Sequence, residues 1–254
     1  MKRLLIIFSL LILIATFFDY PIAQMIYDPS ALWADIVYIY GELPSMIVTS
    51  LAFVFLSIIY ERYRYINLSL SFIVGTWAGV QVAHHAGHSI WIAGLLAFMI
   101  TLTVHAYLRK MNLEWIDRYK HRLIIIAWTG LLAWLSPQII KMIWARPRPY
   151  VVFSGEEFQA WYLGFNLTLN NAYKSFPSGH SAVASSLIAL NTLKLEIKTK
   201  YFGIMNLIIS FYIGLVMISR MVRGDHYLSD VVFGGMISMT IFTLLKNDQK
   251  KRDR

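Results

Sequence analysis

Residues 44–60 read PSMIVTSLAFVFLSIIY, 17 positions without a charged side chain. The run ends at Glu61, Arg62 and Arg64. A helix needs roughly 20 mostly apolar residues to cross the hydrocarbon core of a bilayer, and charged residues mark where it leaves that core. This stretch therefore predicts a membrane-spanning helix and, with it, an all-α membrane protein, because only helices and closed barrels satisfy their backbone inside lipid.

Similar apolar runs recur along the chain, at 4–18, 123–140, 178–193, 202–218 and 227–245. The run 66–108 is too long for one crossing and is interrupted by His84, His85 and His88, so we divide it into two helices. The prediction is a transmembrane bundle of eight spans, or six if the pair around these histidines is a re-entrant hairpin. Residues 19–42 are more polar and aromatic, and we expect them to lie along the membrane interface.

The composition supports a membrane protein. Hydrophobic residues make up 57% of the chain and charged residues 15%, whereas soluble domains carry about 25% charged residues. The chain has no cysteine, which excludes disulfides, thiolate metal ligands and cysteine nucleophiles.

The Lys and Arg residues fall unevenly on the two sides of the predicted bundle. With the N-terminus in the cytoplasm, 17 of the 23 lie on the cytoplasmic side, as expected for short loops. We therefore expect a multi-pass protein of the cell membrane with both termini, including the tail 246–254, in the cytoplasm. The other six cations gather on the extracytoplasmic side, where basic residues are usually disfavoured: Lys141, Arg146, Arg148, Lys174, Arg220 and Arg223.

Three polar segments occupy the extracytoplasmic ends of predicted spans: KMIWARPRP (141–149), PSGH (177–180) and SRMVRGDHYLSD (219–230). Arginine and lysine bind phosphate, arginine through a planar fork of donors. The free N–H groups of a helix that starts near Ser178 would favour an anion, and Gly179 would allow the ligand close to the backbone. Together the segments predict a phosphate site.

Two histidines give this site a possible chemistry. His226 and Asp230 are four residues apart, which places them on one face of a helix. A carboxylate can hold the imidazole tautomer while the other ring nitrogen attacks phosphorus. His180 can protonate the leaving oxygen and later activate water. Few carboxylates lie nearby, so the sequence implies no metal and no other cofactor.

The three segments resemble the signature motifs of the type 2 phosphatidic acid phosphatase (PAP2) superfamily: Lys-x6-Arg-Pro, Pro-Ser-Gly-His and Ser-Arg-x5-His-x3-Asp. Every motif position and the internal spacings match. The resemblance implies a PAP2-like catalytic core over 123–245, preceded by N-terminal transmembrane helices and an interfacial loop over 1–122. It implies that the catalytic residues are His226, His180 and Asp230 and that the phosphate ligands are Lys141, Arg148, Ser178, Gly179 and Arg220.

The resemblance also implies a metal-independent lipid phosphatase that works through a phosphohistidine at the extracytoplasmic face. Undecaprenyl pyrophosphate is the first substrate expected, followed by phosphatidylglycerophosphate and phosphatidic acid. We expect membrane lipids and the lipid phosphate as partners, and no nucleic acid. A lipid phosphotransferase and a non-enzymatic lipid transporter are the alternatives, but a transporter would not explain two histidines and an aspartate at these spacings.

Three charged residues lie beside the motif positions. Arg146 and Arg223 are expected either to widen the basic patch or to bind lipid headgroups. Asp225 is expected to cap the last helix.

Overall fold

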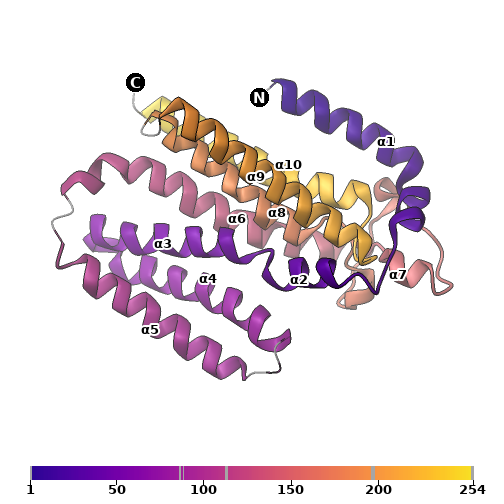
Figure 1. Ribbon diagram of the computed structural model, residues 1–254, viewed down its shortest axis with the longest axis horizontal. Coiled ribbons are helices and arrows are strands. Elements are labelled where there is room, and N and C mark those ends of the chain that lie inside the picture. The colour runs from indigo at the N-terminus through magenta and orange to yellow at the C-terminus, as the bar shows by residue number, and fades with distance from the viewer. Residues whose placement is uncertain (1, 86, 88, 112–113, 196–197, 253–254) are drawn as a thin grey trace.

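The computed structural model describes residues 2–85, 87, 89–111, 114–195 and 198–252. All regular elements in these ranges are helices, which confirms the all-α prediction. The axes of the long helices are roughly aligned (Figure 1). The connections around α7 lie at one end of the bundle, here called the loop end.

Five α-helices form the N-terminal half: α1 (Lys2–Ile26), α2 (Leu32–Tyr40), α3 (Leu43–Ile59), α4 (Arg64–His85) and α5 (Ile90–Leu108). The C-terminal half consists of α6 (Lys120–Trp144), α7 (Pro149–Val152), α8 (Gly179–Ser185), the 3₁₀-helix η5 (Ser186–Leu195), α9 (Thr199–Val222) and α10 (Leu228–Arg252). The shorter 3₁₀-helices are η1 (Glu61–Tyr63), η2 (Glu114–Tyr119), η3 (Trp161–Leu163) and η4 (Asn171–Tyr173).

Seven helices of the described chain are long and apolar enough to cross a membrane. The remaining predicted span, 178–193, appears as α8 followed directly by η5, with 7 and 10 residues. A 3₁₀-helix rises about 2.0 Å per residue against 1.5 Å in an α-helix, so the pair extends over about 30 Å, the thickness of the hydrocarbon core. The segment therefore has the length of a crossing without being a single α-helix.

The region expected to lie along the interface, 19–42, has a different structure. It forms the last turns of α1 and the whole of α2, and α2 leads into α3 as one apolar stretch, Leu32–Ile59. The polar Asp19 does not end α1, because its side chain is buried against Arg146 at 2.9 Å. A charged residue with a buried partner need not mark the edge of the membrane.

The main apolar core lies where α3, α4 and α6 meet η5 and α10. Its buried side chains include Phe53, Val74, Leu131 and Phe242. A smaller cluster joins α1 to α9 and α10 through Phe8, Met221 and Val231. These two cores hold α6, α9 and α10 close together.

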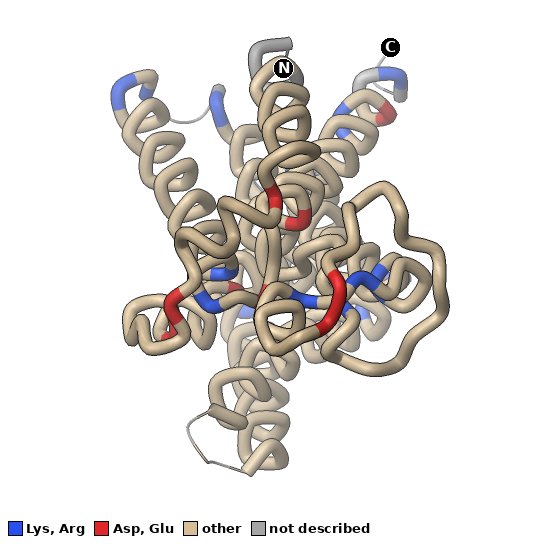
Figure 2. Tube along the Cα trace, turned by 90° about the vertical axis from the view of Figure 1, so that its right-hand side faces the viewer, with Lys and Arg blue, Asp and Glu red and all other residues tan. Residues whose placement is uncertain are grey.

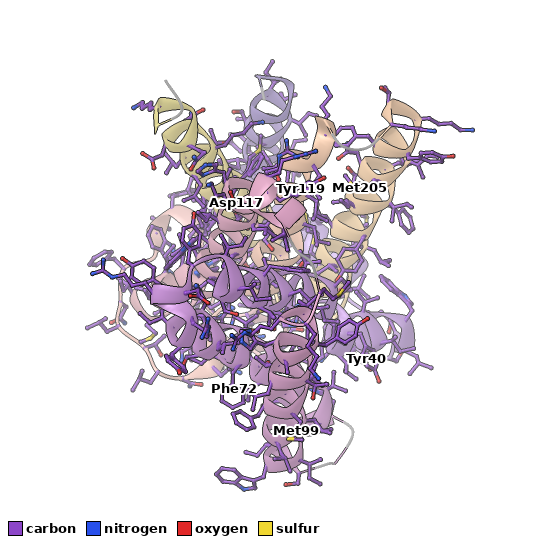
Figure 3. The ribbon with its side chains drawn as sticks, turned by 90° about the vertical axis from the view of Figure 1, so that its left-hand side faces the viewer. Tyr40, Phe72, Met99, Asp117, Tyr119 and Met205 are labelled. Carbon is purple, nitrogen blue, oxygen red and sulfur yellow. The ribbon has the colours of Figure 1, made fainter. Side chains whose placement is uncertain are left out.

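The two ends of the bundle differ. Facing the loop end, Figure 2 shows Lys and Arg side by side with Asp and Glu across the middle of the molecule. From the opposite end, Figure 3 shows the connection between α5 and α6, marked by Asp117 and Tyr119, and the side chains of Phe72 and Met99 on the α4–α5 pair. Met99 on α5 is 53% exposed, as expected for a helix that faces lipid.

Gly234 allows α10 to pack directly on the start of α8. A Cβ at Gly234 would lie 2.4 Å from the carbonyl oxygen of Ser178 and 3.2 Å from the amide nitrogen of Ala182. Both are backbone atoms, which cannot move aside by changing a rotamer. Small residues at such crossings let transmembrane helices approach closely.

We expect Gly234→Ala to lower the free energy of unfolding by roughly 1–3 kcal/mol, the usual cost of overpacking. Thermal unfolding of the purified protein in detergent measures the change. Gly203→Ala is the matched control, because a Cβ on this α9 glycine meets no atom within 4 Å. Equal midpoints for the two variants would contradict the tight α8–α10 contact.

Candidate active site

The three polar segments of the sequence meet at the loop end. The amide nitrogen of Ser178 donates to the carbonyl oxygen of Asp230 at 2.9 Å, which joins the second segment to the third. A Cβ at Gly179 would lie 3.4 Å from the Lys141 ammonium nitrogen, which joins the second to the first. Arg148 contacts Asp225 at 2.6 Å, which joins the first to the third. The sites predicted from distant parts of the chain thus form one cluster.

His226 is held by the backbone just before the second segment. Its Nδ1 lies 2.6 Å from the carbonyl oxygen of Ser175 and 3.7 Å from Asp230 Oδ2. The first distance is a hydrogen bond and the second is too long for one. Nδ1–H therefore donates to Ser175, and this tautomer leaves a lone pair on Nε2.

The environment of His226 favours the neutral ring. Burial is the largest influence and, with the nearby cations Lys141, Arg148 and Arg220, it lowers the pKa of His226 to about 3, while Asp230 opposes the shift. A neutral imidazole has the lone pair that a nucleophile needs. His226 is therefore neutral throughout the physiological pH range, with its one ring proton on Nδ1.

Asp230 is fully buried and has three partners of its own. Its carboxylate accepts from Ser175 Oγ at 2.5 Å, from the amide of Tyr227 at 2.8 Å and from Arg146 at 2.5 Å. Asp230 and His226 thus share Ser175, which binds one through its hydroxyl and the other through its carbonyl. The expected pairing of His226 with Asp230 is indirect in this structure, because these bonds hold the carboxylate away from the ring.

Asp225 forms ion pairs with three arginines and does not cap α10, which begins at Leu228. Its carboxylate lies 2.6 Å from Arg148, 2.9 Å from Arg220 and 3.0 Å from Arg223. Burial raises the pKa of Asp225, but Arg220 and Arg148 lower it further, so the group is an anion. Arg223 also pairs with Asp35 of α2, so the expectation that it binds lipid headgroups is not supported.

Arg220 retains unused donors. Its Nε and Nη1 are buried and have no hydrogen-bond partner among the described residues. A buried donor without a partner costs free energy, most of all on a charged group. This arginine is therefore arranged to receive an acceptor that comes from outside the chain.

His180, the second predicted histidine, contacts residues of the N-terminal half of the chain. Its Nδ1 lies 3.2 Å from Glu42 Oε1 and its Nε2 lies 3.2 Å from the carbonyl oxygen of Tyr38. Ser178 caps α8, since its hydroxyl accepts from the amide of Ser181 at 3.3 Å. In these contacts the hydroxyl predicted to bind phosphate is an acceptor, so its own hydrogen is left for donation.

Arg146 is completely buried, so the expectation that it widens the basic surface or binds headgroups is wrong. It bonds Asp19 at 2.9 Å, Asp230 at 2.5 Å and Ser229 at 2.7 Å, and its guanidinium lies 4.0 Å from the centre of the Tyr227 ring. Arg146 therefore connects α1 with the start of α10 and fixes the carboxylate that lies beside His226.

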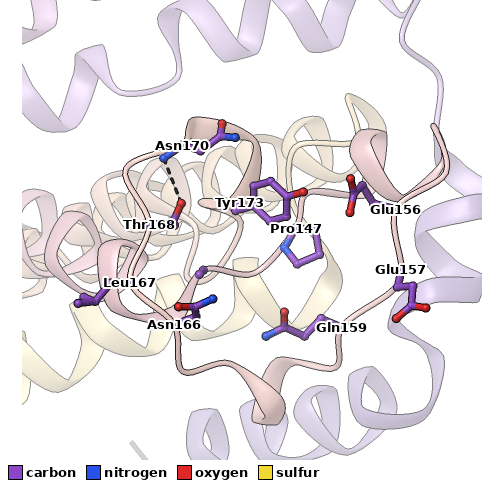
Figure 4. A pocket seen from close by; sticks show the side chains of 10 residues that line it. Pro147, Glu156, Glu157, Gln159, Asn166, Leu167, Thr168, Asn170 and Tyr173 are labelled. Atoms are coloured by element: carbon purple, nitrogen blue, oxygen red, sulfur yellow. Dashed lines mark hydrogen bonds between the residues drawn. The ribbon is translucent and has the colours of Figure 1, made fainter.

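A separate polar cavity of about 400 Å³ lies in the loop between α7 and α8 (Figure 4). Glu156, Glu157 and Asn166 line it, and Pro147 forms part of its wall. Two carboxylates would repel a phosphate, and the motif side chains do not line the cavity. Among the described residues, no three His, Asp or Glu side chains are grouped so that they could hold a metal ion.

Sequence reasoning missed Ser175, Asp19 and Glu42, and assigned Arg146 a different role. No motif spacing includes the first three, and two of them lie far from the motifs in sequence. Asp19 carried one usable signal, since a charged residue next to a long apolar run often has a buried partner. The identity of that partner depends on how α1 folds against α6 and α10.

Replacing Arg146 with alanine is expected to destabilise the protein by roughly 3–5 kcal/mol, because Asp19 and Asp230 would remain buried without their cation. Thermal unfolding in detergent measures this. Arg62→Ala, which removes an exposed arginine at the other end of the bundle, is the control and should unfold like the wild type. A small loss for Arg146→Ala would mean that the two carboxylates do not depend on it.

One of three comparisons with known proteins identifies a family. The model of the PAP2 superfamily matches residues 122–254, just over half of the chain and all three motif segments. No match was found among curated proteins or among solved structures. Members of this superfamily are phosphatases that act on phosphate esters. On its sequence, its helical membrane architecture and its motif cluster, the chain belongs to the PAP2 superfamily.

Proposed function

We propose that the protein removes phosphate from a lipid phosphate or pyrophosphate through a phosphohistidine intermediate at the extracytoplasmic face of the membrane. The unpaired donors of Arg220 carry this proposal, because they need an acceptor that the described chain does not supply and the carbonyl oxygen of the same residue accepts from the amide of His226 at 3.2 Å. A phosphate group has the charge and the number of oxygens to fill that role.

The first half of the reaction forms the intermediate. The lone pair on Nε2 of His226 attacks phosphorus while Nδ1–H stays hydrogen-bonded to the carbonyl oxygen of Ser175. The positive charge that develops on the ring is stabilised by Asp230 at 3.7 Å. The P–O bond to the leaving group breaks, its electron pair goes to that oxygen, and His180 supplies the proton.

The second half restores the enzyme. His180, now lacking the donated proton, takes one from water as the water oxygen attacks the phosphohistidine, and the P–N bond returns its electron pair to His226. In both halves Lys141, Arg148 and Arg220 stabilise the charge on the other phosphate oxygens. Phosphoryl transfer depends mostly on such positioning and charge.

A lipid is the substrate class that this location favours. The cluster lies at the ends of apolar helices, so a lipid can present its phosphate to Arg220 while its chains stay in the bilayer. Undecaprenyl pyrophosphate is our first candidate, ahead of phosphatidylglycerophosphate and phosphatidic acid. The distribution of Lys and Arg supports an extracytoplasmic site, since 17 of the 23 lie toward the opposite end or in the C-terminal tail.

Phosphate release from a panel of these lipids in detergent, with EDTA present, tests the activity. We expect His226→Ala to lose at least about 10²-fold in rate, because the covalent route disappears. Wild type incubated with a labelled lipid phosphate and quenched in alkali should carry label on histidine, and His226→Ala should not. No release by wild type, or equal release by the variant, would favour a lipid transporter, and transfer of label to a second lipid would indicate a phosphotransferase.

The absence of cysteine permits a direct test of sidedness. Ser154→Cys places one thiol on the exposed loop after α7, and Arg118→Cys places one on the exposed turn η2 at the other end. In intact cells, a membrane-impermeant maleimide should label Ser154→Cys at once and Arg118→Cys only after permeabilisation. The reverse pattern would put the site in the cytoplasm.

A further inference from the structure

A second histidine–carboxylate pair faces the motif cluster from the N-terminal half of the chain. Glu42 precedes α3 and is buried, with Oε1 3.2 Å from His180 Nδ1. Its other oxygen, Oε2, accepts from the indole N–H of Trp77 at 3.2 Å. A carboxylate with both oxygens engaged is held in one orientation, as are the carboxylates that orient catalytic imidazoles.

The other side of the His180 ring is also engaged. Nε2 lies 3.2 Å from the carbonyl oxygen of Tyr38, and the ring of Tyr38 packs against the imidazole with centroids 5.2 Å apart. A carbonyl can only accept, so Nε2 carries a proton. One further proton lies between Nδ1 and Glu42, on either atom, and both arrangements satisfy the contacts. The pair is thus prepared with an Nε2–H that it can donate.

We infer that Glu42 is a positioning residue for His180, which makes the ring an effective proton donor to the leaving oxygen. The inference rests on the proposed function and deepens it. When the leaving oxygen replaces the Tyr38 carbonyl as acceptor, the Nε2 proton moves to it and its N–H electron pair stays on Nε2. The proton shared with Glu42 then resides on Nδ1, so the ring ends neutral and the carboxylate ionised. Water later returns a proton to Nε2.

Glu42 has a second possible role that the test must separate. Lys141 and Arg220 lie near enough for their charges to act on Glu42, and on His180 as well. A carboxylate that only neutralised these cations would affect phosphate binding. Such an effect would be the same for every leaving group, whereas proton donation matters only when the leaving group is a poor one.

The leaving group therefore provides the readout. Two substrates are compared, a long-chain alkyl phosphate and a nitrophenyl phosphate that carries an alkyl chain of the same length. Nitrophenolate is a weak base and leaves without being protonated, whereas an alkoxide is a strong base and must receive a proton as it leaves. First-turnover release of the alcohol or phenol, measured by rapid quench, isolates the step in which His180 acts as an acid.

We expect Glu42→Gln to slow first-turnover release of the alkyl alcohol at least about tenfold and to leave nitrophenol release within about threefold of wild type. Trp77→Phe, which frees one oxygen of Glu42, should show the same selective loss to a smaller extent. Glu61→Gln is the matched control, since Glu61 is an exposed glutamate paired with Arg64 at the other end of the bundle, and both rates should stay at wild-type values.

Equal losses on both substrates would overturn the inference and assign Glu42 to phosphate binding or to the fold. Unchanged release of both would overturn it as well. If Glu42→Gln cannot be purified, Trp77→Phe gives the decision by the same comparison. A wild type that cleaves neither substrate would instead contradict the proposed function, so the two failures are distinguishable.

Discussion

Buried charge governs the loop end of this protein. Four cations are buried there among the described residues, Lys141, Arg146, Arg148 and Arg220, and the buried carboxylates are also four, Asp19, Glu42, Asp225 and Asp230. A single unpaired charge in such an environment costs several kcal/mol. The helices therefore meet in a way that places these cations and carboxylates close together, and this requirement orders the site before a substrate arrives.

The N-terminal half is part of that arrangement. Asp19 in α1 and Glu42 before α3 supply two of the four carboxylates, and both lie outside the region matched by the PAP2 family model, 122–254. Asp19 reaches Asp230 through Arg146, and Glu42 reaches His180 directly. Residues outside 122–254 thus contribute to the surroundings of both histidines. Asp19 acts on His226 through Arg146 and Asp230, and Glu42 contacts His180 directly.

The two histidines have environments suited to different tasks. His226 is surrounded by cations and donates Nδ1–H to a neutral carbonyl, which favours the uncharged ring and a free lone pair. His180 faces a carboxylate and a carbonyl, which favours a ring that carries a proton on Nε2. Pairs of titratable groups with contrasting surroundings are a common way to divide nucleophilic and acid roles in one site.

The sequence by itself determined the fold class, the family and the positions of the three motifs. Long uncharged runs such as 44–60 indicate membrane helices. The spacing from Ser219 to Asp230 is local, because it covers the end of α9, a short connection and the start of α10. The tertiary structure alone decided the partners of those residues. Arg146 looked like a surface cation because it follows the end of a predicted span and lies next to Arg148, yet it pairs in the interior with Asp19, 127 residues away. Ser175, Asp19 and Glu42 joined the site through helix packing, which brings together groups that no spacing in the sequence relates.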